Sequence, residues 1–167
     1  PGIIIGLVRI TASAPTRIDL AGGTIDIWPL YLFHPGAQTL NAAISLRAHA
    51  HVDPRDDDCV ALVSVDTARE VVLAPGDRLR TDATLPLLGR LAHHFAACGI
   101  TLTTRGESPA GAGIAGSSAL NIAVCGALNV WTGRLAPPEA LLEIAKDIEA
   151  QVINVPTGLQ DYRPALY

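Results

Sequence analysis

The stretch Ser108-Pro-Ala-Gly-Ala-Gly-Ile-Ala-Gly-Ser-Ser-Ala-Leu-Asn121 decides how this chain is organised. Its three glycines can take a positive φ and let a ligand approach the backbone closely. Ser117 and Ser118 and a long apolar run follow them, which predicts that a helix begins there with the serines as its cap. The free N–H groups and the dipole of a helix N-terminus attract anions, most often phosphate. The stretch therefore predicts a phosphate-binding loop between a strand and a helix. A plain glycine-rich bend is the alternative.

Two better-known phosphate loops fit this stretch less well. Gly111-x-Gly113-x-x-Gly116 has the spacing of the dinucleotide fingerprint, which follows directly on a strand and has an acidic residue ~20 positions later. Here residues 106–109 intervene, and the acidic residue that follows is Glu139, beside a Pro-Pro pair. The Walker loop requires a lysine where Ser117 stands. Dinucleotide binding is thus the weakest functional alternative, and a different phosphate loop is needed.

The segment from Pro109 to Ala119 resembles the second motif of the GHMP kinases, the superfamily of galactokinase, homoserine kinase, mevalonate kinase and phosphomevalonate kinase. That motif reads roughly Pro-x-x-x-Gly-Leu-Gly-Ser-Ser-Ala. Here an isoleucine replaces the leucine, an alanine replaces a usual glycine, and one glycine is additional. The resemblance implies that ATP is bound by Pro109, Gly111, Ala112, Gly113, Ile114, Ala115, Gly116, Ser117 and Ser118. One of the two serines would also contact Mg²⁺, and the additional residue leaves open which one.

A second segment, Ala14-Pro-Thr-Arg-Ile-Asp-Leu-Ala-Gly-Gly-Thr-Ile-Asp26, resembles the first motif of the same superfamily, Ala-Pro-x-Arg-Val-x-Leu-x-Gly. Its Gly-Gly-Thr form is similar to the heptose-phosphate and fucose kinase branch. The resemblance implies that Arg17 lies near the transferring phosphoryl group and that Gly23, Thr24 and Asp26 bind the sugar. The residues themselves agree for Arg17, because guanidinium has a permanent charge and forked donors suited to phosphate. A surface charge on a strand and a turn aspartate are the alternatives for Arg17 and Asp26.

A third segment lies late in the chain. Glu149 sits on an expected helix, and Pro156-Thr-Gly-Leu-Gln-Asp161 follows as a loop. In the superfamily a metal-binding Glu precedes a Pro-x-Gly-x-Asp loop, so the resemblance implies Mg²⁺ binding by Glu149. It also implies that Asp161 is catalytic and contacts the substrate hydroxyl. Mg²⁺ prefers such hard oxygen ligands. An ordinary helix carboxylate is the alternative for Glu149.

The order of strand and helix patterns predicts an α+β domain with helices on one face of a sheet. Strands are expected over 8–12, 17–20, 59–65, 70–73 and 100–104, and two strand-like runs within 39–52. Helices are expected over 85–98, 117–131 and 137–152. The resemblance makes this the N-terminal domain of a GHMP kinase, similar to ribosomal protein S5 domain 2, spanning residues 1–167. A C-terminal ferredoxin-like domain, which such kinases carry, is absent from this chain.

Three further patterns give local expectations. His49, His51 and Asp53 alternate on one strand face, which favours a solvated sheet face over a zinc site. The charge run from Asp53 to Asp58 is typical of a hairpin tip. The aromatic residues at positions 28, 31 and 33 are expected to pack beneath a loop, with stacking on a sugar or a nucleobase as the alternative.

Composition narrows the class of partner. The 167 residues are 49% apolar with a net charge of −4, which argues against a nucleic-acid groove or an anionic membrane surface. Three separated cysteines and no recognisable signal peptide favour reduced thiols in the cytoplasm. The sequence leaves open whether the chain forms a homodimer.

Together the three segments predict an ATP- and Mg²⁺-dependent kinase that phosphorylates a hydroxyl of a sugar or sugar phosphate. A mevalonate- or homoserine-like substrate is an alternative within the family. A non-catalytic nucleotide-binding module is the alternative outside enzymes.

Overall fold

The computed structural model describes residues 8–77 and 84–167, and its frame is a five-stranded mixed sheet. The strand order is β1-β2-β5-β3-β4, with β3 and β5 parallel and the other neighbours antiparallel. The strands are β1 (Ile10–Ala21), β2 (Leu40–Pro54), β3 (Val60–Ser64), β4 (Arg69–Leu73) and β5 (Ile100–Gly106).

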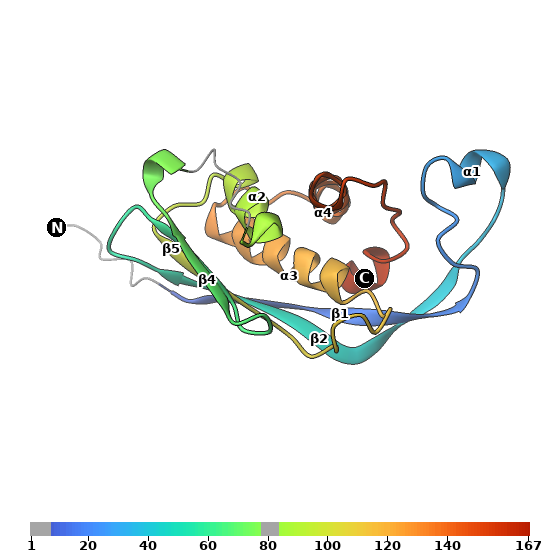
Figure 1. Cartoon of the computed structure of the whole chain (residues 1–167), viewed down its shortest axis with the longest axis horizontal. Coiled ribbons are helices and arrows are strands. Elements are labelled where there is room, and N and C mark those ends of the chain that lie inside the picture. The colour runs from blue at the N-terminus through green and yellow to red at the C-terminus, as the bar shows by residue number, and fades with distance from the viewer. Residues whose placement is uncertain (1–7, 78–83) are drawn as a thin grey trace.

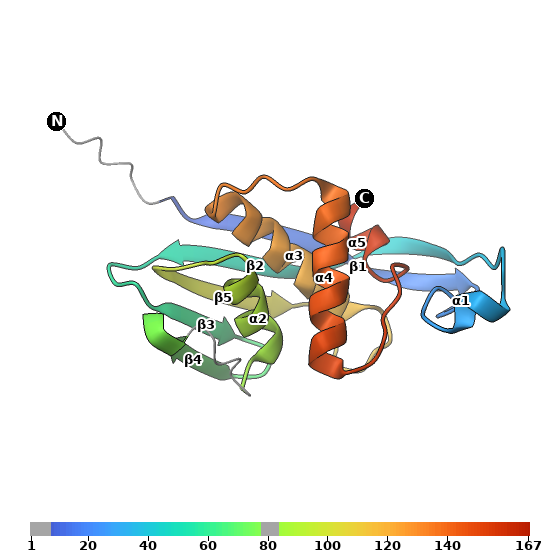
Figure 2. The same cartoon turned by 90° about the horizontal axis from the view of Figure 1, so that it is seen from above.

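Helices cover one face of this sheet (Figure 1). They are α1 (Leu30–Phe33), α2 (Pro86–His94), α3 (Gly116–Trp131), α4 (Pro138–Ile153) and α5 (Arg163–Leu166), with a short 3₁₀ turn, η1, over Pro75–Asp77. Seen from above, α2, α3 and α4 lie over the sheet, while α1 sits at the far end of the β1–β2 hairpin (Figure 2). The prediction of an α+β domain with helices on one face of a mixed sheet is confirmed.

Alternation along β2 separates the two faces of the sheet. Ala48, Ala50 and Val52 are buried beneath the helices, whereas His49 and His51 are only partly buried and point the other way. His49 contacts Glu107, and His51 contacts Thr11 across the β1–β2 ladder. No group of three metal-ligating side chains occurs in residues 8–77 and 84–167. His49 and His51 therefore lie on the sheet face opposite the helices, in agreement with the predicted strand alternation.

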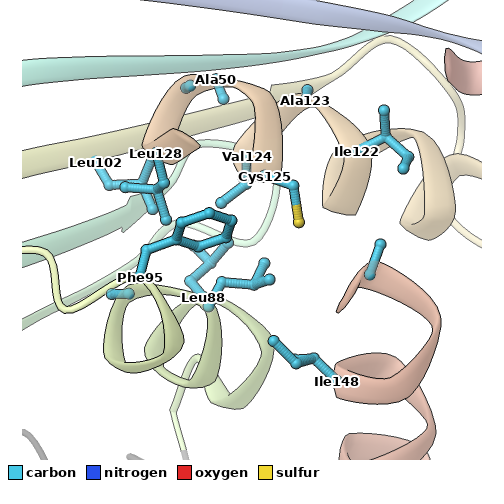
Figure 3. Close-up of a cluster of buried hydrophobic side chains, with 14 of the residues drawn as sticks. Ala50, Leu88, Phe95, Leu102, Ile122, Ala123, Val124, Cys125, Leu128 and Ile148 are labelled. Atoms are coloured by element: carbon cyan, nitrogen blue, oxygen red, sulfur yellow. The ribbon is translucent and has the colours of Figure 1, made fainter. Parts of the chain in front are cut away.

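Helix α3 is the centre of the core. It is buried along most of its length, and it packs on β1 and β2 from one side and on α2 and α4 from the other. Figure 3 shows Leu128, Val124 and Cys125 of α3 facing Leu88 of α2 and Phe95 at its C-terminal end. A helix held on so many sides fixes its N-terminus, and that end points at the glycine-rich loop.

Two local expectations are wrong. The run from Asp53 to Asp58 does not turn a hairpin, because β5 lies between β2 and β3 and the segment crosses over it. The aromatic side chains are not packed beneath a loop: Trp28 is 59% exposed and Phe33 71%. Helix α2 is also shorter than the expected 85–98. It ends at His94 because Ala96 adopts a left-handed φ of 52°, which an α-helix cannot continue through.

Candidate functional site

The glycine-rich loop connects the end of β5 to the start of α3. Gly111 and Gly113 have φ values of 74° and 70°, the left-handed region that glycine adopts without strain. Residues 109–113 are exposed. Pro109 has no N–H, and the Ala112 N–H donates to the Pro109 carbonyl at 3.2 Å, so the N–H groups open to a ligand are those of Ala110, Gly111 and Gly113. Ala115, at φ 58°, is the N-cap of α3 and carries no side-chain capping bond. The serines that follow were expected to cap the helix, and neither does so.

A groove of about 550 Å³ lies along this loop. It is lined by residues 108–117 and by Thr16, Arg17, Arg47, Ala48, Asp66, Thr67, Gly106, Leu120 and Asp161. Thr16 and Arg17 belong to β1 and Arg47 to β2, so the groove runs between the glycine-rich loop and the sheet. Its volume lies within the usual range of small-molecule sites, ~300–1,000 Å³. We refer to it as the loop groove.

Arg17 joins the three segments that the sequence analysis singled out. Its Nε and Nη2 donate to Oδ1 of Asp161 at 3.0 and 2.5 Å, and its Nη1 donates to the carbonyl of Gly113 at 2.9 Å. Asp19 adds a contact at 3.3 Å to Nε. The Arg17 side chain is only 9% exposed, because the bulge of β1 at this point turns it toward the loop. A surface strand charge is therefore ruled out for Arg17.

Glu149 lies behind the loop on α4 and is buried. Its Oε1 accepts a hydrogen bond from Ser117 Oγ at 2.9 Å, and its Oε2 accepts one from the Tyr162 hydroxyl. Burial, followed by the neighbouring Glu149 carboxylate, raises the pKa of Tyr162. The phenol therefore stays protonated and donates. Ser117 lines the loop groove, whereas Ser118 is buried and does not. Ser117 and Glu149 together offer hard oxygen atoms, the ligand type that suits Mg²⁺.

Asp26 lies outside the loop groove and contacts the segment just before Asp161. Its Oδ2 accepts hydrogen bonds from the backbone N–H groups of Leu159 and Gln160 at 2.5 and 2.9 Å, so it holds the loop that carries Asp161. Gly158 makes this contact sterically feasible, because a Cβ there would overlap the Asp26 carboxylate. Asp26 lines a separate cavity of about 380 Å³ between α1 and α5. We refer to this cavity as the Gln160 pocket.

Thr24 and Gly23 belong to the hydrogen-bond network beside that pocket. Gln160 Nε2 donates to Thr24 Oγ1 at 3.2 Å, and the Thr39 hydroxyl donates to the Gly23 carbonyl at 2.9 Å. Asn41 donates to the Gln160 carbonyl at 2.9 Å. The predicted residues thus fall into two groups: Arg17, Asp161, Ser117 and the loop at the groove, and Gly23, Thr24 and Asp26 at the Gln160 pocket.

Several residues of the site were not foreseen. Tyr162, Gln160 and Asn41 support the predicted residues, and Arg47 lines the loop groove. Asn41 was visible only as a polar interruption in a strand pattern, and Tyr162 only as the neighbour of Asp161. Neither signal indicates a contact partner. Asn41 bonds to Gln160, 119 residues away in sequence, and Tyr162 bonds to Glu149 on helix α4.

Glu107, which directly precedes the glycine-rich loop, is anchored to strand β2. It accepts a backbone hydrogen bond from Arg47 at 2.9 Å and contacts His49 Nε2 at 3.0 Å. These two donors, the backbone N–H first, lower the pKa of Glu107 below its usual value. The carboxylate is ionised at neutral pH and ties the loop to β2.

The arrangement differs from a dinucleotide site. In that fold the glycine-rich helix leads into a second parallel strand. Here α3 is followed by α4, and no strand follows in residues 107–167.

The helices of the described segments are all too short or too polar to cross a bilayer.

Comparison with known proteins gives a consistent family. Residues 83–167 match the family model described as GHMP kinases N terminal domain. The D-glycero-alpha-D-manno-heptose 7-phosphate kinase of Campylobacter jejuni is 29% identical over 164 residues, which cover 95% of this chain and 48% of the relative. The L-fucokinase/L-fucose-1-P guanylyltransferase of Bacteroides fragilis is 30% identical over 89% of this chain and 18% of its own length.

Solved structures agree on the fold. A D-glycero-D-manno-heptose 1-phosphate kinase from Bacteroides thetaiotaomicron superposes with a TM-score of 0.83 at 23% identity. The match covers 96% of this chain and 54% of that protein. The chain therefore spans about half the length of the heptose kinases it matches.

Proposed function

Because the chain belongs to the GHMP kinases, whose N-terminal domain it contains, we propose that the protein transfers a phosphoryl group from ATP to a hydroxyl of a sugar or sugar phosphate. The observation that carries the proposal is the contact of Arg17 with both Asp161 and the Gly113 carbonyl. That contact brings the glycine-rich loop, the β1 arginine and the late aspartate to one groove. Phosphoryl transfer requires such convergence, because its catalysis consists mainly of positioning and electrostatic stabilisation.

The loop groove would receive the nucleotide. Pro109 and the residues from Gly111 to Ser118 would surround the phosphates. The exposed N–H groups of Gly111 and Gly113 and the N-terminus of α3 together favour a triphosphate. Ser117 and Glu149 would hold Mg²⁺, which neutralises charge on the phosphates when bound. Of the two serines we assign Ser117 to the metal, because its hydroxyl lines the groove and already contacts Glu149.

Asp161 and Arg17 would act on the reacting groups. The Asp161 carboxylate accepts or orients the proton of the acceptor hydroxyl, and only its Oδ1 is engaged by Arg17. Arg17 holds Asp161 in place and, with its permanent charge, stabilises the negative charge that develops on the phosphoryl oxygens. Gly23, Thr24 and Asp26 would contact the sugar from the side of the Gln160 pocket.

A sugar acceptor is favoured by the relatives, since both curated ones are named as kinases of sugars or sugar phosphates. The Gly-Gly-Thr segment next to the Gln160 pocket points the same way. A mevalonate- or homoserine-like acceptor is the alternative. Three unpaired cysteines support a reducing compartment such as the cytoplasm.

The proposal is tested with Asp161→Asn in the intact protein. We expect turnover to fall by ~10²–10⁴-fold while ATP binding is retained, since a positioned base contributes about that much. Asp147→Asn, an exposed carboxylate of α4, is the matched control and should leave both unchanged. Unaltered turnover in Asp161→Asn would exclude Asp161 from catalysis.

A second candidate is a nucleotide-binding module without turnover. The observation that favours it is the ion pair of Arg17 and Asp161, which engages both proposed catalytic side chains with each other. ATP binding by the intact protein with no phosphorylation of any hexose, heptose or sugar phosphate would support it.

A further inference from the structure

The Gln160 pocket has an unused positive charge. Arg163 lines it and is exposed, and no hydrogen bond or ion pair engages its guanidinium within residues 8–77 and 84–167. The two arginines of the loop groove are both engaged: Arg17 by Asp161, and Arg47 by the side chain and carbonyl of Ser13. An arginine that lines a pocket without a partner is a ready site for a carboxylate or phosphate.

From this difference we propose that the Gln160 pocket receives a sugar that already carries a phosphate group, and that Arg163 together with His34 binds that phosphate. The inference rests on the proposed function and deepens it. The proposed function allows a free sugar or a sugar phosphate as the acceptor, whereas the charge in this pocket favours the sugar phosphate.

The other lining groups suit the neutral part of such a ligand. Asn41 and Gln160 present amides, and Tyr31 contributes an aromatic ring that is 48% exposed. Hydroxyl groups are recognised by amides and carboxylates, and ring faces of sugars pack on aromatic side chains. The volume of about 380 Å³ is at the small end of the range for ligand sites, which fits one sugar phosphate.

The one carboxylate of the pocket does not cancel the charge of Arg163. Asp26 directs Oδ2 at the N–H groups of Leu159 and Gln160, so its negative charge is partly balanced by the backbone. His34 lines the same pocket and supplies a further N–H donor.

The position of the pocket agrees with transfer to a hydroxyl. Gln160 and Arg163 line it, and Asp161, between them in sequence, lines the loop groove instead. A sugar phosphate bound through Arg163 would therefore keep its phosphate on the pocket side. Its hydroxyl would face Asp161 and the nucleotide.

The experiment is a binding comparison on the intact protein by isothermal titration calorimetry. The ligands are D-glycero-D-manno-heptose 7-phosphate and mannose 6-phosphate, each beside the same sugar without phosphate. Arg163→Gln should weaken binding of the sugar phosphates by ~10–100-fold, which corresponds to the loss of a charged hydrogen bond. It should leave binding of the free sugars unchanged. Arg163→Lys should recover part of the affinity, and His34→Gln should cost less than Arg163→Gln.

Arg105→Gln is the matched control, because Arg105 is exposed and lines neither cavity. It should bind all four ligands as the unaltered protein does. The inference is overturned if Arg163→Gln binds sugar phosphates normally, if it loses sugar and sugar phosphate equally, or if the unaltered protein binds neither sugar phosphate.

A parallel transfer assay with ATP separates this inference from the proposed function. Phosphorylation of free sugars only would leave the kinase proposal intact and refute the phosphate-binding role of Arg163. Selective binding of sugar phosphates without transfer would support the role of Arg163 and refute the kinase proposal.

Discussion

Replacing Gly158 by alanine tests the contact that holds the catalytic loop. A Cβ at Gly158 would lie 2.5 Å from Oδ2 of Asp26 and closer still to Cγ and Oδ1, so the carboxylate must move away. That carboxylate accepts the N–H groups of Leu159 and Gln160, and a hydrogen bond to a charged group contributes ~1.5–3 kcal/mol. Because Asp26 is exposed and solvent weakens each bond, we use ~1–2 kcal/mol for each of the two bonds. We expect the free energy of unfolding to fall by about 2–4 kcal/mol.

The assay is urea denaturation followed by circular dichroism, on single and double variants. In an Asp26→Ala background the two hydrogen bonds and the overlap are already gone, so Gly158→Ala should then cost less than ~1 kcal/mol. The coupling energy of about 2 kcal/mol is typical of residues in direct contact. Gly126→Ala is the matched control. Its nearest neighbour would be Ala12 Cβ at 3.9 Å, and an alanine inside α3 should stabilise by up to ~1 kcal/mol. Equal costs of Gly158→Ala in both backgrounds would refute the proposed contact.

Three further changes are expected to have defined effects. Ala115→Gly should raise the free energy of unfolding by up to ~1 kcal/mol in urea denaturation, because it relieves a left-handed φ of 58°, and a decrease would contradict this. Tyr162→Phe should lower the free energy of unfolding by ~1–3 kcal/mol and raise the Mg²⁺ concentration needed for activity, because one oxygen of the buried Glu149 loses its hydrogen-bond donor. An unchanged Mg²⁺ requirement would show that Tyr162 does not support the metal site. Burial raises the pKa of Cys125 to about 12, so a thiol reagent at pH 8 should label the exposed Cys98 but not Cys125 in the folded protein. The same shift contributes stability that is complete below pH 9 and is lost as the pH rises toward 12, so alkaline denaturation should release the Cys125 thiol only together with the whole fold.

The parts of the fold that follow from local pattern were predictable. The apolar run after Ser117 predicts α3 to within one residue, and the alternation of His49 and His51 predicts the face of β2 that is turned away from the helices. The strand order was not predictable. Strand β5 lies between β2 and β3 because its apolar side chains are buried there, and no turn in the sequence signals that position. Ile100 and Leu102 of β5 are fully buried. The sequence from Asp53 to Asp58 would suit a hairpin turn and a connection past a middle strand equally well.

The candidate site was predictable where the chain resembles a known motif. Arg17 and Asp161 were identified before their contact was known, and the structure brings them together. The separation of Asp26 from the loop groove was not foreseen, since sequence spacing gives no account of which cavity a turn residue lines. The role of Arg163 was equally hidden, because it depends on the lack of a partner rather than on any pattern of residues.

Strand β5 occupies the middle of the sheet although four strands precede it in the chain. During synthesis on the ribosome, β2 and β3 therefore emerge with unsatisfied edges and cannot pair with each other across the gap that β5 fills. Open edges of this kind are sites of intermolecular association. A nascent chain that stops before Ile100 would hold two separate hairpins with open edges, whereas one extended past Gly106 could close the sheet in a single step.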